Sequence, residues 1–327
     1  MSEAFLQVRD LKVHFPVRTG GILIGQYSPL KAVDGVSFDL NPGETLGVVG
    51  ESGCGKSTLG RAVLQLIGAT DGTVSWLGTD LTSLDKKELI AARENLQIVF
   101  QDPLASLDPR MTAGDIIAEP LRNYRPAMTK AERRKMVEGM MERVGLLPRM
   151  INRYPHEFSG GQCQRIGIAR AMILHPKLVV CDEPVSALDV SIQAQVVNLL
   201  MDLQRDLGLS LLFISHDLAI VRHISHRVLV LYLGRVMELA DKASIYATPH
   251  HPYTQALLSA VPIPDPVKER AKERVLLTGD IPSPLYPPSG CVFRTRCPRA
   301  TALCADKVPQ LEQAGAGHDV ACHHWNT

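Results

Sequence analysis

The sequence lacks long apolar runs, an excess of one charge and a targeting signal. No apolar run approaches the ~18 residues that a helix needs to span a bilayer. The N-terminal segment "MSEAFLQVRDLKVHF" has neither the basic nor the apolar region of a signal peptide. Basic and acidic side chains number 35 and 34, for a formal net charge of +1, so nothing in the charge balance indicates a nucleic-acid partner. We therefore expect a soluble, cytosolic protein that reaches a membrane only through partner subunits.

Cysteine is also scarce until the C-terminal end. Only three of the seven cysteines precede residue 290. The other four are spaced C-x5-C-x6-C-x17-C, at Cys291, Cys297, Cys304 and Cys322. In a reducing cytosol, clustered cysteines favour metal binding or catalysis over disulfides. The spacing matches neither the short cysteine pairs of structural zinc sites nor the close-packed ferredoxin pattern, so by itself it is weak evidence for any metal.

The order of the remaining patterns indicates an α/β protein. Short buried strands such as "TLGVVG", "LQIVF" and "LSLLFIS" alternate with helical patterns, which predicts a mostly parallel sheet. Residues 5–15 and 30–40 alternate apolar with polar and predict two further strands, with the Gly/Pro-bounded segment 16–29 between them as a loop. Residues 112–174 have helical periodicity and many charges, which predicts an inserted helical subdomain. Prolines accumulate from about residue 249 onward and predict a small irregular appendage.

The segment "GESGCGKST" fits the phosphate-loop pattern G-x-x-x-x-G-K-[ST], with an apolar strand before it and a helical pattern after it. Glycines let backbone N–H groups turn inward around phosphate oxygens, and the following helix N-terminus adds partial positive charge. The lysine reaches the β- and γ-phosphates, and the serine hydroxyl can ligate Mg²⁺. The predicted ATP-binding residues of this loop are Gly50, Glu51, Ser52, Gly53, Cys54, Gly55, Lys56, Ser57 and Thr58. We expect the thiol of Cys54 to act as a spacer.

Two carboxylates and a histidine follow later buried strands. Asp182 and Glu183 end "LVVCDEP", and His216 follows "LLFIS". Asp182 can hold Mg²⁺, and Glu183 can accept a proton from an attacking water. Taken alone, two acids at a strand end indicate a helix cap and a lone histidine indicates a structural role. The phosphate loop upstream favours the catalytic interpretation, because ligands bind at the carboxyl ends of strands in such sheets.

One further motif carries a family resemblance. "FSGGQCQR" resembles the signature of ATP-binding-cassette (ABC) ATPases, and other elements of that family follow in the expected order. The signature positions are Ser159, Gly160, Gly161 and Gln162; the D-loop positions are Ser186, Ala187, Leu188 and Asp189. Gln101 in "VFQDP" matches the Q-loop, His216 matches the switch histidine, and Phe15 matches the adenine-stacking aromatic. Cys163 stands where the family usually has arginine, and Phe158 where leucine is common.

The resemblance implies an ABC nucleotide-binding domain over residues 1–248, with a RecA-like core, an antiparallel β portion and the helical subdomain. It implies that two cassettes face each other and that the signature of one covers the ATP of the other. Glu183, His216, Lys56 and Gln101 would be the catalytic residues. Mg²⁺ would be held through Ser57, Gln101 and Asp182.

The C-terminal region, residues 249–327, narrows the resemblance. "HPYTQALLSAVP" and "GDIPSPLYPPSGCVFRTRCPRA" resemble the region that follows the cassette in ATPase subunits of bacterial dipeptide and oligopeptide importers, closest to the second ("F-type") ATPase. This implies an ATPase that energises peptide import, peripheral at the cytoplasmic face of the inner membrane. The implied partners are a second, non-identical ATPase subunit, two transmembrane permease subunits and, indirectly, a periplasmic peptide-binding protein, with no nucleic acid.

Several alternatives stay open. Close relatives of this group import nickel or other small solutes, so the cargo rests on the family alone. Soluble ABC ATPases that act on DNA or ribosomes usually carry two cassettes or long coiled-coil insertions, which this chain lacks, and a non-catalytic cassette would not need Glu183 and His216.

Tails that resemble this one hold a [4Fe–4S] cluster on four cysteines, here Cys291, Cys297, Cys304 and Cys322. The nearby His318, His323 and His324 keep zinc or mixed ligation open, and ordinary reduced thiols without any metal are a third alternative.

Overall fold

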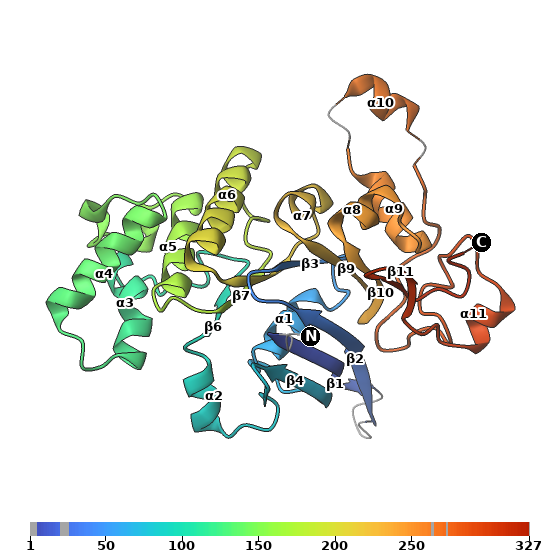
Figure 1. Ribbon diagram of the computed structural model, residues 1–327, viewed down its shortest axis with the longest axis horizontal. Coiled ribbons are helices and arrows are strands. Elements are labelled where there is room, and N and C mark those ends of the chain that lie inside the picture. The colour runs from blue at the N-terminus through green and yellow to red at the C-terminus, as the bar shows by residue number, and fades with distance from the viewer. Residues whose placement is uncertain (1–4, 20–25, 263–264, 273, 327) are drawn as a thin grey trace. The chain divides into compact units, whose positions relative to one another are not determined.

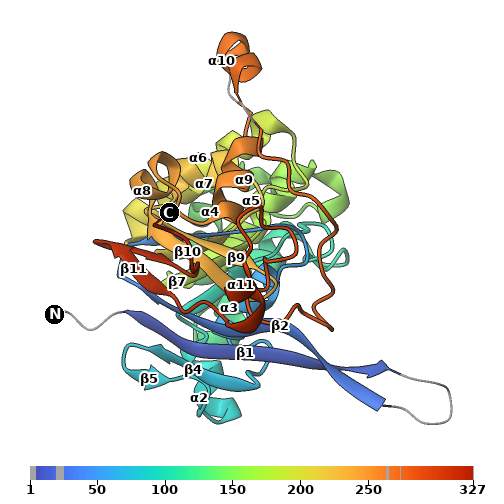
Figure 2. The same cartoon turned by 90° about the vertical axis from the view of Figure 1, so that its right-hand side faces the viewer.

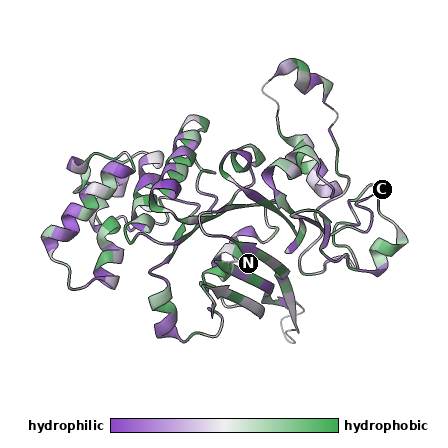
Figure 3. Cartoon of the chain, in the orientation of Figure 1, coloured by the Kyte–Doolittle hydropathy of each residue, from purple (hydrophilic) through white to green (hydrophobic). Residues whose placement is uncertain are grey.

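A computed structural model describes residues 5–19, 26–262, 265–272 and 274–326 of the chain. The chain divides into two compact units (Figure 1). Unit 1 comprises Met1–Leu40, Thr45–Ser83 and Ser215–Thr327, and unit 2 comprises Asn41–Glu44 and Leu84–Ile214. Each unit is built around its own strands, and the helices mix hydrophobic and hydrophilic residues (Figure 3). No helix of the described residues is long and apolar enough to cross a membrane.

Unit 1 contains an antiparallel sheet in the order β2-β1-β4-β5. Its strands are β1 (Leu6–Thr19), β2 (Gln26–Leu40), β4 (Asp71–Trp76) and β5 (Thr79–Asp80). The expected loop at 16–29 is wrong for residues 16–19 and 26–29, because β1 and β2 continue pairing as a long ribbon through Pro16↔Pro29 to Thr19↔Gln26 (Figure 2). An isolated ribbon buries little side chain, so its sequence needs no apolar alternation, and prolines are tolerated where strands lie at an edge. The rest of that loop, residues 20–25, lies outside the described residues.

Unit 1 also contains a mixed set of strands in the order β11-β12-β10-β9-β3. Their bounds are β3 (Thr45–Val49), β9 (Arg227–Tyr232), β10 (Arg235–Asp241), β11 (Glu312–Gly315) and β12 (His318–Val320). Strand β3 is buried along its whole length and runs parallel to β9, which makes it a core strand ending at the phosphate loop. The helices of unit 1 are α1 (Lys56–Val63), α7 (Leu218–Ile224), α8 (Lys242–Ala247), α9 (Pro252–Ala260), α10 (Pro266–Ala271) and α11 (Ala302–Asp306).

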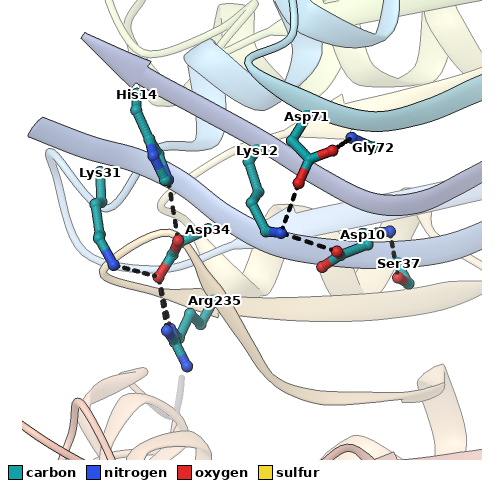
Figure 4. Close-up of polar contacts among 9 residues, drawn as sticks. All are labelled: Asp10, Lys12, His14, Lys31, Asp34, Ser37, Asp71, Gly72 and Arg235. Atoms are coloured by element: carbon teal, nitrogen blue, oxygen red, sulfur yellow. Dashed lines mark hydrogen bonds and ion pairs between the residues drawn. The ribbon is translucent and has the colours of Figure 1, made fainter. Parts of the chain in front are cut away.

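A charged network links the two sheets of unit 1 (Figure 4). The carboxylate of Asp34 on β2 accepts hydrogen bonds from the Arg235 guanidinium of β10, the closer at 2.6 Å, and lies 3.0 Å from Nε2 of His14. Burial, the largest single cause, would raise the pKa of Asp34, but Arg235, Lys31 and His14 together outweigh it and the pKa is lowered. The Asp34 N–H also donates to the carbonyl of Gly234, whose own N–H donates to the carbonyl of Cys54. The network thus ends on the phosphate loop and helps to hold it.

Unit 2 is a parallel sheet in the order β8-β7-β6 with helices. Its strands are β6 (Leu96–Val99), β7 (Leu178–Asp182) and β8 (Ser210–Ile214), and β7 and β8 are fully buried. Its helices are α2 (Lys86–Ala92), α3 (Ala113–Tyr124), α4 (Lys130–Arg143), α5 (Gly160–Met172) and α6 (Val190–Leu207), with short 3-10 turns at Pro148–Met150 and Pro155–Glu157. Helices α3 to α5 lie within the stretch 112–174 for which the sequence predicts helical structure.

The C-terminal region is held to β10 by a buried polar centre. Glu238 of β10 is fully buried, and its carboxylate accepts hydrogen bonds from the backbone N–H groups of His250 and His251. The ring of His318 on β12 lies 2.6 Å from the same carboxylate. A buried carboxylate needs such partners, because each lost hydrogen bond leaves charge without solvation. This centre places residues on both sides of position 248 in one unit, and the domain boundary at 248 stays a prediction.

Candidate functional site

The phosphate loop between β3 and α1 is shaped by glycines with positive φ. Gly50, Gly53 and Gly55 have φ values of +154°, +77° and +105°, which side chains rarely adopt. A Cβ on Gly50 would lie 2.1 Å from the Leu231 carbonyl oxygen, and one on Gly55 would lie 2.0 Å from that of Ala32. The loop is therefore packed against neighbouring backbone and tolerates no larger residue at these two positions.

Lys56 is the first residue of α1, and its side chain folds back over the loop. Its Nζ donates to the carbonyl oxygens of Gly50, at 2.8 Å, and Glu51, at 3.0 Å, and the residue is 4% exposed. The first turn of α1 has no acidic residue, and its N-cap, Gly55, provides no side-chain hydrogen bond. The helix N-terminus and a nearby ammonium together favour an anion at the loop.

The thiol of Cys54 is buried inside the loop. Burial raises its pKa to about 11 against the opposing charge of Lys56. A neutral, buried thiol is a poor nucleophile, which agrees with the expected role of Cys54 as a spacer.

In unit 2, the strand end of β7 carries the two carboxylates. Asp182 is fully buried as the last residue of β7. Glu183 follows with φ +46°, in the left-handed region that non-glycine residues rarely occupy. Its N–H donates to the carbonyl of Ile214, and its Oε2 accepts from Nε2 of Gln101 at 3.1 Å. The strained backbone and the glutamine together fix the direction of the Glu183 carboxylate, as residues at catalytic sites often require.

The signature residues form the start of α5. Ser159 is the N-cap, its hydroxyl accepts from the N–H of Gln162, and the Gln162 side chain accepts from the N–H of Ser159. Ser159 and Gly160 are exposed, so this helix N-terminus is open to a ligand or a second chain. Cys163, the departure from the family pattern, is fully buried and its Sγ lies 3.5 Å from the carbonyl oxygen of Pro155. Because the Cys163 side chain is buried on the inner face of α5, it cannot contact a ligand at the exposed N-terminus of this helix.

The other expected site residues are divided between the units. His216 in unit 1 is exposed, and the next residue, Asp217, caps α7. Phe15 on β1 is 37% exposed and pairs with Leu30, as a stacking surface requires. In unit 2, the D-loop lies between β7 and α6, and the Ser186 hydroxyl donates to the carbonyl of Glu183 at 3.1 Å. The structure thus brings Gln101, Glu183 and Ser186 together within unit 2.

Two contacts to the phosphate loop were missed by sequence reasoning. Arg296 of the C-terminal region forms an ion pair with the Glu51 carboxylate, and the Tyr253 hydroxyl accepts a hydrogen bond from the Glu51 N–H. No motif spacing connects residues so far apart in the chain. The one available signal is a pair of arginines, Arg294 and Arg296, within the short cysteine-bounded stretch "CVFRTRC".

The four C-terminal cysteines lie near one another. Burial is the main cause of the raised pKa values of Cys291, Cys297 and Cys322, with Cys291 at about 11, and neighbouring thiols of the group add to each shift. All four are free thiols. Within the described part of the chain, however, no three His, Cys, Asp or Glu residues are arranged as a group that could hold a metal ion. The thiols are gathered, but their present arrangement does not fit a metal centre.

Comparisons with known proteins agree with the geometry. Family models match at residues 33–186 (ABC transporter) and 237–304 (oligopeptide/dipeptide transporter, C-terminal region). The oligopeptide transport ATP-binding protein OppF of Escherichia coli is 62% identical over 98% of this chain and 96% of its own length. The oligopeptide transport ATP-binding protein AppF of Bacillus subtilis is 53% identical over 98% and 97%.

Solved structures with the same fold include an ATP-binding cassette in a dimeric post-hydrolysis state bound to ADP and Pi. It is 29% identical, with a TM-score of 0.64 over 72% of this chain and 98% of its own. CbiO1 of Clostridium perfringens, part of an ABC transporter complex, is 25% identical with a TM-score of 0.64 over 76% of this chain and 92% of its own. With its phosphate loop, its signature helix and full-length relatives, the chain belongs to the ABC transporter ATP-binding proteins, in the branch that carries the oligopeptide/dipeptide transporter C-terminal region.

Proposed function

We propose that this chain hydrolyses ATP to energise the import of di- and oligopeptides, as one ATP-binding subunit of a multi-subunit ABC transporter. The observation that carries the proposal is a filled set of cassette motifs in a chain that is 62% identical, along its whole length, to an oligopeptide transport ATP-binding protein. Glycine-lined loop geometry and the buried Lys56 support nucleotide binding.

The roles of the residues follow from their surroundings. The loop N–H groups and Lys56 bind the phosphates. Glu183, aimed by Gln101, accepts a proton from the attacking water. His216 contacts the γ-phosphate. Phe15 stacks on the adenine.

Mg²⁺ would be held through Ser57, Gln101 and Asp182, which carry the hard oxygen donors that this ion prefers. Asp182 is a fully buried carboxylate at a strand end, an environment in which a cation stabilises its charge. When bound with ATP, Mg²⁺ neutralises charge on the β- and γ-phosphate oxygens.

Partner subunits complete the proposed machine. The exposed N-terminus of α5, with Ser159 and Gly160, would supply donors to the γ-phosphate held by a second, similar ATPase subunit, with the D-loop beside it. Completing the site in trans ties hydrolysis to closure of the pair. Two permease subunits would carry the peptide and anchor the chain at the cytoplasmic face of the inner membrane, and a periplasmic peptide-binding protein would act indirectly.

The cargo is tested with the assembled transporter in proteoliposomes. Labelled di- and tripeptides should accumulate with the cognate binding protein present, and an excess of unlabelled peptide should compete. Competition by nickel ions but not by peptide would replace the peptide proposal with the metal-import alternative. A chain that does not associate with permease subunits at all would favour a soluble, non-transport ATPase.

We also propose that the four-cysteine tail holds a [4Fe–4S] cluster as an accessory group. The gathering of four thiols in an irregular segment supports it, because bound metal can organise a segment that has little core of its own. The arrangement of the thiols in the structure does not support it, so no catalytic step is assigned to the cluster.

The expected result for this tail is a brown protein after anaerobic purification, with about four iron atoms per chain and little zinc. Metal analysis and the absorption spectrum of the wild type and of Cys304→Ser give the measurement, with Cys54→Ser as a control outside the tail. A colourless, metal-free chain with a folded tail would contradict the proposal, and stoichiometric zinc would replace iron with zinc.

A further inference from the structure

The C-terminal region contacts the phosphate loop through a bidentate ion pair. Nη1 of Arg296 lies 2.6 Å from Oε2 of Glu51, and Nη2 lies 3.0 Å from Oε1. Arg296 is 8% exposed, whereas the Glu51 side chain is 25% exposed. A fork-to-fork pair of this kind fixes both charge and direction, which a single contact does not.

A second contact holds the backbone of the same residue. The N–H of Glu51 donates to the hydroxyl of Tyr253 at 2.9 Å. Tyr253 is the second residue of α9 and is fully buried. Its ring packs on those of Tyr232 and Phe293, with centroids 4.8 and 5.3 Å away, and Tyr232 also packs on Phe293 at 5.3 Å. Glu51 is therefore held at its side chain by Arg296 and at its backbone N–H by Tyr253, both of the C-terminal region. The aromatic rings that pack on Tyr253 keep its hydroxyl in position.

Helix α9 is itself fixed in place. His251 caps it, with Nδ1 accepting from the Tyr253 N–H at 3.0 Å. Burial lowers the pKa of His251 to about 3, so the ring stays neutral and keeps this acceptor at physiological pH. The His251 N–H is one of those bound by the buried carboxylate of Glu238. The position of Tyr253 thus follows from the core of unit 1, not from a mobile side chain.

The charge of Glu51 explains why such support matters. A carboxylate in a loop that binds ATP repels the phosphates unless a cation offsets it. Lys56 donates a hydrogen bond to the carbonyl of Glu51, and Arg296 forms the ion pair with the Glu51 carboxylate. Removing Arg296 would leave a partly buried negative charge beside the phosphate site.

We propose that Arg296 and Tyr253 are positioning residues for ATP binding, so that the C-terminal region sets the affinity of the phosphate loop for nucleotide. Arg296 acts through the carboxylate of Glu51, and Tyr253 acts through its N–H. This inference rests on the ATPase function proposed above and adds the region that follows the cassette to the machinery of the ATP site.

The test is a double-mutant cycle on ATP affinity with the full chain and with the assembled transporter. Arg296→Met should raise the ATP KM about tenfold, the order expected for loss of one charge-assisted pair, with kcat within about twofold of wild type. Adding Glu51→Gln to Arg296→Met should lower the ATP KM most of the way back to the wild-type value, because the carboxylate that has lost its partner is then gone. Arg296→Lys keeps the positive charge but not the two parallel hydrogen bonds of the guanidinium. Its ATP KM should therefore lie between those of wild type and Arg296→Met. Exposed Arg299→Met should match wild type.

Salt separates electrostatic positioning from simple loss of structure. Screening weakens charge repulsion, so raising the salt concentration should narrow the gap in KM between Arg296→Met and wild type. The inference is overturned by a wild-type KM in Arg296→Met, by a double variant as poor as the single one, or by a gap that salt leaves unchanged. If Arg296→Met fails to assemble, the comparison of Arg296→Lys with Arg299→Lys carries the test, and equal KM values overturn the inference. The binding of a fluorescent ATP analogue to the isolated chain can be measured without any transport. This affinity therefore tests the roles of Arg296 and Tyr253 even if the chain does not energise peptide import.

Discussion

Glu183→Gln is expected to leave ATP binding intact and to reduce ATP turnover by a factor of about 10² to 10⁴, the range supplied by a positioned general base. Glutamine keeps the shape of the side chain and an oxygen that can accept the hydrogen bond from Gln101, but it cannot take a proton from water. The closed pair of cassettes should then persist, because the step that releases it is slowed. Phosphate release and equilibrium ATP binding give the two measurements.

The matched control is Glu142→Gln, which changes an exposed glutamate near the end of α4 in the same unit. It should leave both quantities unchanged. Undiminished phosphate release by Glu183→Gln would remove Glu183 from the role of base, and would leave the strained backbone at that residue without the function assigned to it.

Lys56→Met is expected to weaken ATP binding about a hundredfold and to remove turnover with it. The substitution keeps an unbranched side chain of similar length at a position that is 4% exposed, so the fold of the loop should survive while the cation is lost. Charge-assisted hydrogen bonds to phosphate are among the stronger contacts in proteins, and every 1.4 kcal/mol is a factor of ten in affinity.

Titration with a fluorescent ATP analogue measures the Lys56 effect, and the thermal midpoint shows whether the fold is kept. Lys177→Met, at an exposed lysine just before β7, is the control. The outcome that contradicts the assignment is a folded Lys56→Met chain with wild-type affinity.

The two variants differ in a useful way. Loss of Glu183 should separate binding from turnover, whereas loss of Lys56 should remove both, because we propose that Glu183 acts on the water and Lys56 on the phosphates. If Glu183→Gln and Lys56→Met changed ATP binding and turnover in the same way, one of the two proposed roles would be wrong.

The phosphate loop could be predicted from sequence because its chemistry is contiguous. Nine neighbouring residues carry the glycines, the lysine and the hydroxyls, and the structure shows the positive φ values that those glycines permit. The same holds for the start of α5, where Ser159 and Gln162 form a capping box that can be read from three-residue spacing. Local rules suffice where the partners are local.

Prediction failed where the partners are distant or the pattern is indistinct. Arg296 and Glu51 are separated by 245 positions, and no periodicity connects them. The sequence pattern indicates a loop at residues 16–19 and 26–29, but these residues pair as a β1–β2 ribbon that is defined there by backbone pairing and not by an apolar face. The cysteine spacing showed that thiols are concentrated in the tail, but spacing carries no geometry, and the arrangement found is a cluster of thiols without a metal-binding group among the described residues.

The C-terminal region therefore does more than identify a branch of the family. Its buried centre at Glu238 joins β10, α9 and β12, and its arginine and tyrosine reach the first variable residue of the phosphate loop.

The measurement that tests the central claim most directly is ATP-driven accumulation of labelled peptide by proteoliposomes that contain the permease subunits, the second ATPase and this chain. With wild type, peptide should accumulate above its external concentration only when ATP and Mg²⁺ are supplied on the side that carries the ATPases. With Glu183→Gln in this chain, accumulation should fall strongly while the complex stays assembled and binds ATP. Peptide accumulation that is unaffected by ATP, or equal for wild type and Glu183→Gln, would contradict the account.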